Sequence, residues 1–208
     1  MAIDRTNWKN KNLLMNSIIY KNRAIPVYFE RLSKYGSSNL SEQKKVISNI
    51  LELFNNYQIV ILGDREFCSV KLAQWLDKQE LKFCLRLKKN EQVELENNIW
   101  IQLKDCRLKP GISFFLENVK VTKTKKVEGF NIACKWKRSY RESETLEGWF
   151  ILTNMNDTSE ALSEALPKVI AAYKKRCSLK VSRLPGVINI MFVYFNIYIK
   201  VYFPVDIC

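Results

Sequence analysis

Apolar strands alternate with helical stripes through the first half of the chain, and this alternation constrains the fold more than any other feature. Residues 13–20 and 24–32 are rich in β-branched and aromatic side chains, and the polar residues between them suit a hairpin. Ser41 is a good N-cap for the helical spacing of apolar residues that follows it to about residue 57. The sequence therefore predicts two antiparallel strands that are followed by an amphipathic helix.

A buried strand comes next. Residues 58–63, "QIVILG", form a short and nearly continuous apolar run of the kind that is covered on both faces. Residues 69–79 return to helical spacing, and residues 82–90 read as a further strand. Strand, helix, strand, helix, strand is the order of an α/β core.

The pattern changes to a period of two residues between positions 111 and 153. Apolar and polar side chains alternate most clearly over residues 130–137, which predicts antiparallel strands with one basic face. We expect this section, residues 111–154, to project from the core as a separate antiparallel layer. The lysines available to its basic face are Lys120, Lys123, Lys125, Lys126, Lys135 and Lys137.

Charge and the absence of one residue type limit the function. Lys and Arg number 34 against 21 Asp and Glu, a net charge of +13 that predicts a polyanionic partner, of which nucleic acid is the commonest. The chain contains no histidine, which excludes Ser-His-Asp and Cys-His nucleophiles and most catalytic zinc sites. Chemistry is left to carboxylates, lysine, tyrosine or cysteine.

The six cysteines and the last residues complete the composition argument. The cysteines form no CxxC pair, so we expect free, mostly buried thiols in a reducing cytosol and no structural zinc. Residues 187–205 approach the length of a membrane span, but Asn189, Asn196 and Lys200 argue against one. Residues encoded by A and T alone dominate this stretch, which looks like a translation of intergenic or out-of-frame DNA.

Two aspartates stand where neighbouring strands would bring them together. Asp4 lies on the first strand and Asp64 just after the fourth. Like charges this close repel each other unless a divalent cation lies between them. Asp64 also suits an ordinary loop or helix cap, and Glu66 beside it suits a salt bridge to Lys or Arg better than a metal.

Four segments together resemble a known family. "AIDRTNW", "LGDREF", "WFILTN" and "AYKKRCS" resemble, in order, the catalytic segments of bacterial insertion-sequence transposases of the DDE class that bear the YREK signature. The similarity covers residues 1 to about 179. It implies an α/β fold, an RNase H-like mixed sheet with flanking helices and an inserted antiparallel β section.

The resemblance also implies roles for individual residues. Asp4 and Asp64 match the two metal-binding catalytic aspartates, while Tyr173 and Arg176 match the Tyr and Arg that contact DNA phosphates. The implied cofactor is magnesium in a two-metal site, which serves DNA cleavage and strand transfer without a covalent enzyme intermediate. The implied partner is double-stranded DNA at transposon ends, bound by a homodimer in the nucleoid of the cytoplasm, with no membrane involved.

The sequence departs from the family pattern at its third carboxylate. Lys180 stands where the signature has Glu, and Val187 stands where it has Lys. We therefore expect a catalytically impaired remnant, frameshifted or diverged after about residue 179 and lacking the DNA-binding region that precedes the first Asp. The expected divisions are a first part of the core at 1–110, the β section at 111–154, a closing helix at 155–180 and an anomalous tail at 181–208.

We predict that Lys123, Lys125, Lys126 and Lys135 bind DNA. Two other classes of function remain open on the sequence alone. The first alternative is a non-catalytic basic nucleic-acid-binding module, in which binding is sensitive to salt and the aspartates have no role. The second is a membrane-tethered protein anchored by its tail.

Overall fold

Over the residues that it describes, the structure, a computed structural model, is a ten-stranded mixed sheet with three α-helices. The tail at 181–208, predicted to be anomalous, lies outside the residues that it describes, as do Lys125, Lys137 and Lys180. The described residues are 1–8, 10–21, 23–95, 98–123, 126–136, 148–155 and 162–177.

Three antiparallel strands open the fold. β1 (Ala2–Trp8) pairs with β2 (Lys11–Tyr20), and β2 pairs with β3 (Arg23–Leu32). The predicted hairpin is confirmed. Its register shifts once, between Asn16 and Ser17, where the pairing passes Pro26, because proline has no N–H to donate to the ladder.

The helix that follows begins earlier than expected. α1 (Leu40–Leu53) is capped by Asn39, whose side chain accepts a hydrogen bond from the Glu42 backbone N–H at 2.9 Å. The Glu42 carboxylate accepts in turn from the Asn39 N–H at 2.6 Å, which completes a capping box. The prediction of Ser41 as N-cap is wrong by two residues, because a reciprocal box satisfies two donors where a lone serine satisfies one.

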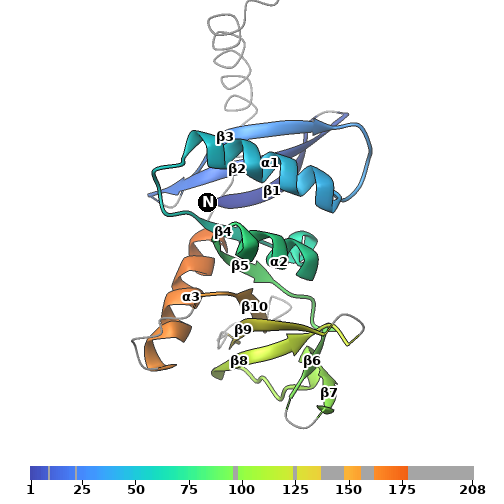
Figure 1. Ribbon diagram of the computed structural model, residues 1–208, viewed down its shortest axis with the longest axis vertical. Helices are drawn as coiled ribbons and strands as arrows, with labels where there is room; N and C mark the ends of the chain where they lie inside the picture. Colours follow the sequence, from blue (N-terminus) through green and yellow to red (C-terminus); the bar gives the residue numbers. More distant parts are fainter. Residues whose placement is uncertain are drawn as a thin grey trace, which may run out of the picture.

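Two parallel strands continue the sheet. β4 (Val60–Gly63) lies parallel to β1 and to β5 (Lys82–Arg86), and the short 3-10 helix η1 (Arg65–Phe67) and α2 (Val70–Lys78) connect β4 to β5. The apolar runs predicted as strands are thus confirmed. Figure 1 shows α1 and α2 next to each other, with α3 (Leu162–Cys177) elsewhere on the molecule.

The antiparallel section extends this same sheet. Beyond β5 come β10 (Trp149–Thr153), β9 (Val127–Lys135) and β8 (Ser113–Val121), then β6 (Gln92–Glu94) and β7 (Trp100–Gln102) at the edge, and a 3-10 turn, η3 (Leu103–Asp105), follows β7. The full order is β3-β2-β1-β4-β5-β10-β9-β8-β6-β7. The expected separate layer is wrong among the described residues, because β10 hydrogen-bonds to β5 on one side and to β9 on the other.

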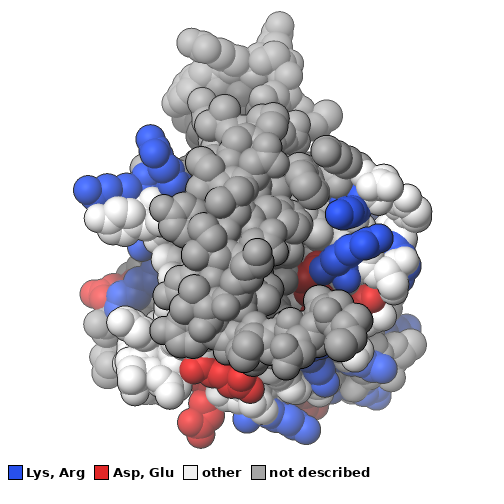
Figure 2. All heavy atoms as spheres, turned by 90° about the horizontal axis from the view of Figure 1, so that it is seen from above, with Lys and Arg blue, Asp and Glu red and all other residues white. Residues whose placement is uncertain are grey.

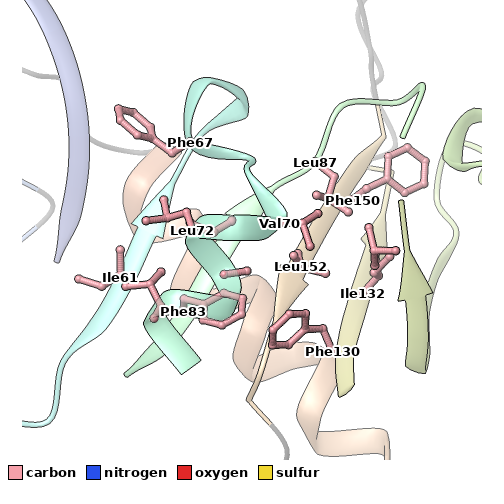
Figure 3. Close-up of a cluster of buried hydrophobic side chains, with 14 of the residues drawn as sticks. Ile61, Phe67, Val70, Leu72, Phe83, Leu87, Phe130, Ile132, Phe150 and Leu152 are labelled. Carbon is pink, nitrogen blue, oxygen red and sulfur yellow. The ribbon is translucent and has the colours of Figure 1, made fainter. Parts of the chain in front are cut away.

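Helices cover both faces of the central strands. Ile61, Phe83, Ile132 and Leu152 belong to the large core that includes α2 residues, part of which Figure 3 shows. Their neighbours along each strand point to the other face and pack with α3. These are Leu62, Cys84, Ala133 and Ile151. The fold is therefore α/β, with the predicted RNase H-like mixed sheet, flanking helices and inserted antiparallel strands.

The basic face predicted for residues 130–137 is wrong for the described part of β9. Asn131 and Ala133, which were expected to face solvent, are buried together with Phe130, Ile132 and Cys134. α3 covers the face of β9 that the sequence pattern predicted to be exposed to solvent. Lys120 on β8 is paired with Glu94 at 3.2 Å and Glu128 at 3.6 Å.

α3 runs unbroken through Pro167. Proline removes one intrahelical hydrogen bond, and the buried side chains of Val169, Ile170 and Tyr173 hold the helix to the sheet beyond it. Of the helices in the described segments, none has the length and apolar character needed to span a membrane.

Candidate active site

Two adjacent parallel strands position Asp4 and Asp64. β1 pairs with β4 through Ala2 and Leu62, and Leu62 packs with α3. Ile3 belongs to the core on the opposite face, so its neighbour Ala2 is on the α3 side. Asp4 is two residues beyond Ala2, so its side chain points to that same face. Asp64 follows the end of β4 directly. The geometry thus gathers both acids on the α3 side of the sheet.

A glycine makes room for the sharp exit from β4. A Cβ at Gly63 would lie 2.8 Å from Leu85 Cδ2 and 2.9 Å from Phe67 Cβ, closer than packed carbon atoms approach. Its absence lets η1 fold directly against the strand. Asp64 Oδ1 then caps η1 by accepting from the Glu66 N–H at 3.0 Å. The helix-capping role considered for Asp64 is thus confirmed, and Asp64 Oδ2 remains available to another partner.

That partner is Arg176, in the last turn of α3. Its Nη2 lies 2.9 Å from Asp64 Oδ2 and 3.4 Å from Asp4 Oδ1. The two oxygens are therefore no farther apart than the sum of those distances, which is below the upper limit of roughly 8 Å for two carboxylates that share cations. The Arg176 side chain is only 15% exposed, against 38% for Asp4 and 37% for Asp64.

The two acids fit a hard divalent cation in chemistry. Carboxylate oxygens are the ligands that Mg²⁺ prefers, with water or substrate oxygens completing the shell. Asp4 and Asp64 already converge on one cationic nitrogen, that of Arg176. Among the described residues, no group of three or more Asp, Glu, Cys or His side chains is placed to hold a metal ion.

The electrostatics at Asp4 agree with its position. Burial raises the pKa of Asp4 above its ordinary value, the Arg176 guanidinium opposes that rise, and the carboxylates of Asp64 and Glu66 add to it. A carboxylate that is partly desolvated beside another acid is costly when ionised, and a cation between the two offsets that cost.

Glu66 faces a different cation. Its carboxylate accepts from Arg5 Nε at 2.8 and 2.9 Å and from the Ser38 N–H and hydroxyl, both at 3.1 Å. Arg5 Nη1 also reaches Asn12 Oδ1 at 3.4 Å, and Asn12 Nδ2 donates to the carbonyls of Lys34 and Gly36. The salt bridge expected for Glu66 is confirmed, and its partner ties β1 and η1 to the loop before α1.

Sequence reasoning missed this network. Arg5 follows Asp4 on the strand and therefore points to the opposite face, towards Glu66. The alternation of side chains along β1 was the available signal, but it did not identify Ser38 and Asn12, because their contacts depend on how the loop at 33–39 folds back.

Tyr173 lies in the core and not on the surface. Its side chain is 0% exposed, and its ring meets that of Trp149 on β10 edge to face, with centroids 5.4 Å apart. Tyr173 precedes Arg176 by one helical turn, so this packing fixes the end of α3 from which Arg176 reaches the aspartates. Its predicted contact with DNA stays a prediction.

The lysines predicted to bind DNA fall near the β8–β9 connection and the end of β9. Lys123 and Lys126 flank the turn, and Lys135 ends β9, while Lys125 lies outside the described residues. Lys126 lines an open pocket of about 330 Å³ together with Asp77 and Glu128, so acidic groups are mixed with it. In Figure 2, the described Lys and Arg side chains likewise lie on several sides of the view and form no single patch.

Comparison with known proteins identifies the family. The model of the transposase DDE domain family matches residues 34–178, most of the chain. The chain belongs to this family. No curated protein matches it. Among solved structures, a cryo-EM structure of a piggyBac transposase synaptic complex with hairpin DNA is similar, with a TM-score of 0.48 and 16% identity over 90% of this chain. The chain spans 43% of the length of that transposase.

Membership in the DDE family is consistent with the transposase resemblance of the four sequence segments. The match includes Asp64, Tyr173 and Arg176, and Asp4 lies ahead of it. The catalytic, metal-binding and DNA-binding roles of individual residues stay predictions, as do the proposed divisions of the chain.

Proposed function

We propose that this chain is the catalytic domain of a DNA transposase, which cuts double-stranded DNA at transposon ends and transfers the strands, and that this copy is catalytically impaired. One observation carries the proposal. In a member of the DDE transposase domain family, two aspartates from adjacent parallel strands converge on a single cationic nitrogen. The binding-module alternative assigns no task to this pair.

Asp4 and Asp64 would hold the divalent ions in this proposal. When bound, magnesium supplies activation of a water or 3′-hydroxyl nucleophile and stabilisation of the leaving oxygen. Arg176 would contact a phosphate near the reacting strand end, and Tyr173 would keep Arg176 in place by packing against Trp149. Lys123, Lys125, Lys126 and Lys135 would bind the DNA backbone without reading its sequence.

Impairment follows from Lys180. An ammonium at the sequence position of the third carboxylate offers no ligand to a metal ion, and it carries a positive charge where the signature has a negative one. Val187 also replaces the lysine of the signature. Changing Lys180→Glu alone should therefore leave the chain inactive. DNA binding requires neither residue, and the protein should still associate with the nucleoid and with a second copy on DNA.

The test is magnesium-dependent nicking of a supercoiled plasmid. We expect no nicking by the unmodified chain, and nicking by a chimera in which the sequence after Cys177 is replaced by that of an intact family member. Asp64→Asn in the chimera should abolish the activity, while Glu52→Gln, an exposed charge on α1, should not.

Two results would contradict the proposal. Nicking by the unmodified chain that Asp64→Asn abolishes would disprove the impairment and leave the transposase function standing. A folded chimera that neither nicks plasmid nor binds duplex DNA would disprove the function itself.

A further inference from the structure

Arg176 holds the position between the two aspartates that a shared divalent cation would take. We propose that Arg176 competes with the divalent metal for Asp4 and Asp64, so that metal binding releases its guanidinium for a DNA phosphate and couples the two binding events. This inference rests on the proposed function, and it concerns the order in which the site is filled.

The competition follows from which oxygens are used. Arg176 Nη2 contacts Asp64 Oδ2 and Asp4 Oδ1. Asp64 Oδ1 is engaged as the cap of η1, and Asp4 Oδ1 also accepts from the Arg5 N–H at 3.0 Å. A metal ion at coordination distance, roughly 2.0–2.1 Å for Mg²⁺, would need the oxygen that Asp64 now presents to the guanidinium. Two cations cannot share this space without strong repulsion.

The released guanidinium would need a new anion. Its side chain is only 15% exposed, and its Nε is buried with no acceptor among the described residues. Once a metal takes the carboxylates, the charge of Arg176 loses both of its ion-pair partners. A buried unpaired charge is costly, and a phosphate offers oxygens that match the fork of a guanidinium.

Linkage makes this exchange measurable. If metal binding frees Arg176 for phosphate, then phosphate binding must strengthen metal binding by the same factor. Without DNA, by contrast, Arg176 weakens metal binding, because its contacts with Asp4 and Asp64 must first be broken. Removing the guanidinium therefore raises metal affinity in free protein and removes the coupling.

The experiment titrates the full chain with Mn²⁺ and follows the EPR signal of the free ion, with no DNA present. We expect Arg176→Gln to bind Mn²⁺ about three- to tenfold more tightly than the original chain, from the loss of two partly exposed ion pairs. Arg176→Lys keeps the charge on a shorter side chain, and its Mn²⁺ affinity should lie between those of Arg176→Gln and the original chain. Lys174→Gln removes an exposed charge from the same turn of α3 and should change the affinity less than twofold. Circular dichroism reports whether each variant folds.

A second titration repeats the measurement with a short DNA duplex. The duplex should increase the Mn²⁺ affinity of the original chain. The increase should be much smaller for Arg176→Gln. Equal Mn²⁺ affinities of folded Arg176→Gln, folded Arg176→Lys and the original chain, with binding still lost in Asp64→Asn, would overturn this inference and leave the metal site intact. If Asp64→Asn does not weaken Mn²⁺ binding, the metal site of the proposed function fails as well.

Discussion

Glu66 and Asp64 are neighbouring acids with separate cations, and the separation gives each a different task. Glu66 is 16% exposed and pairs with Arg5, while Asp64 reaches Arg176. Glu66→Ala leaves the Arg5 guanidinium and the Ser38 donors without their acceptor. We expect this change to lower the free energy of unfolding by about 2 kcal/mol, measured by urea denaturation.

The exposed Glu52 on α1 provides the control for Glu66. Glu52→Ala should change stability by less than about 0.5 kcal/mol. Arg5→Ala combined with Glu66→Ala should cost less than the sum of the single changes, with a coupling of about 1 kcal/mol. Strictly additive costs would show that the pair contributes nothing through its contact.

Gly63 is the second residue on which the site depends. A methyl group there meets Leu85 and Phe67 at 2.8 and 2.9 Å, so Gly63→Ala should destabilise the fold by about 1–3 kcal/mol and displace Asp64. Thermal denaturation measures the loss. Leu85→Ala removes the nearer contact, and the double variant should therefore lose less than the two single variants together. An undiminished loss in the double variant would place the strain elsewhere.

At the scale of elements, the sequence predicts the strands and helices well where one period or one apolar run dominates. β4, β5 and α2 lie within the predicted runs, although β5 ends at Arg86, before the predicted end at residue 90. The prediction for β9 is wrong, because its alternating pattern assigns Ala133 to the solvent face, whereas this side chain packs under α3. An alternating pattern shows that a strand has two faces, and only the tertiary structure decides whether the second is covered.

The reactivity of Cys84 and Cys134 can show whether α3 separates from the sheet as a local unit. Cys84 faces α3 and Cys134 faces the opposite core. Burial raises the pKa of Cys84 to about 12 and also raises that of Cys134, so neither thiol should react with iodoacetamide at pH 8 in the native protein. Ile170→Ala leaves a cavity under α3 and weakens its packing against the sheet. We expect this change to speed the labelling of Cys84 at least about tenfold, as measured by peptide mass spectrometry.

Cys134 is the matched control in the same protein. If α3 opens as a local unit, Ile170→Ala accelerates labelling of Cys84 and leaves Cys134 unchanged. Equal acceleration of both thiols would show that they become accessible together by global unfolding, and that α3 has no separate opening.

At the scale of the whole molecule, the sequence brought Asp4 and Asp64 together only through the order of strands and the family resemblance. The sequence could not predict that Arg176 contacts both aspartates. Arg176 is separated from Asp4 by 172 residues, and the pairing depends on which face α3 covers and where its last turn ends. Periodicity places Arg176 on a basic helix and cannot state what that helix faces.

The distribution of charge over the whole molecule decides how it would bind DNA. Each lysine that neutralises a phosphate releases counterions, so binding weakens as salt rises. Changing Lys123, Lys125, Lys126 and Lys135 to Gln should lower the slope of log affinity against log salt by about 2 to 4, measured by fluorescence anisotropy of a labelled duplex. The control changes four exposed lysines elsewhere, Lys21, Lys71, Lys82 and Lys104, and removes the same net charge. If both sets flatten the slope equally, the protein binds DNA through its net charge of +13, and the lysines of the β8–β9 turn have no special contact with phosphate.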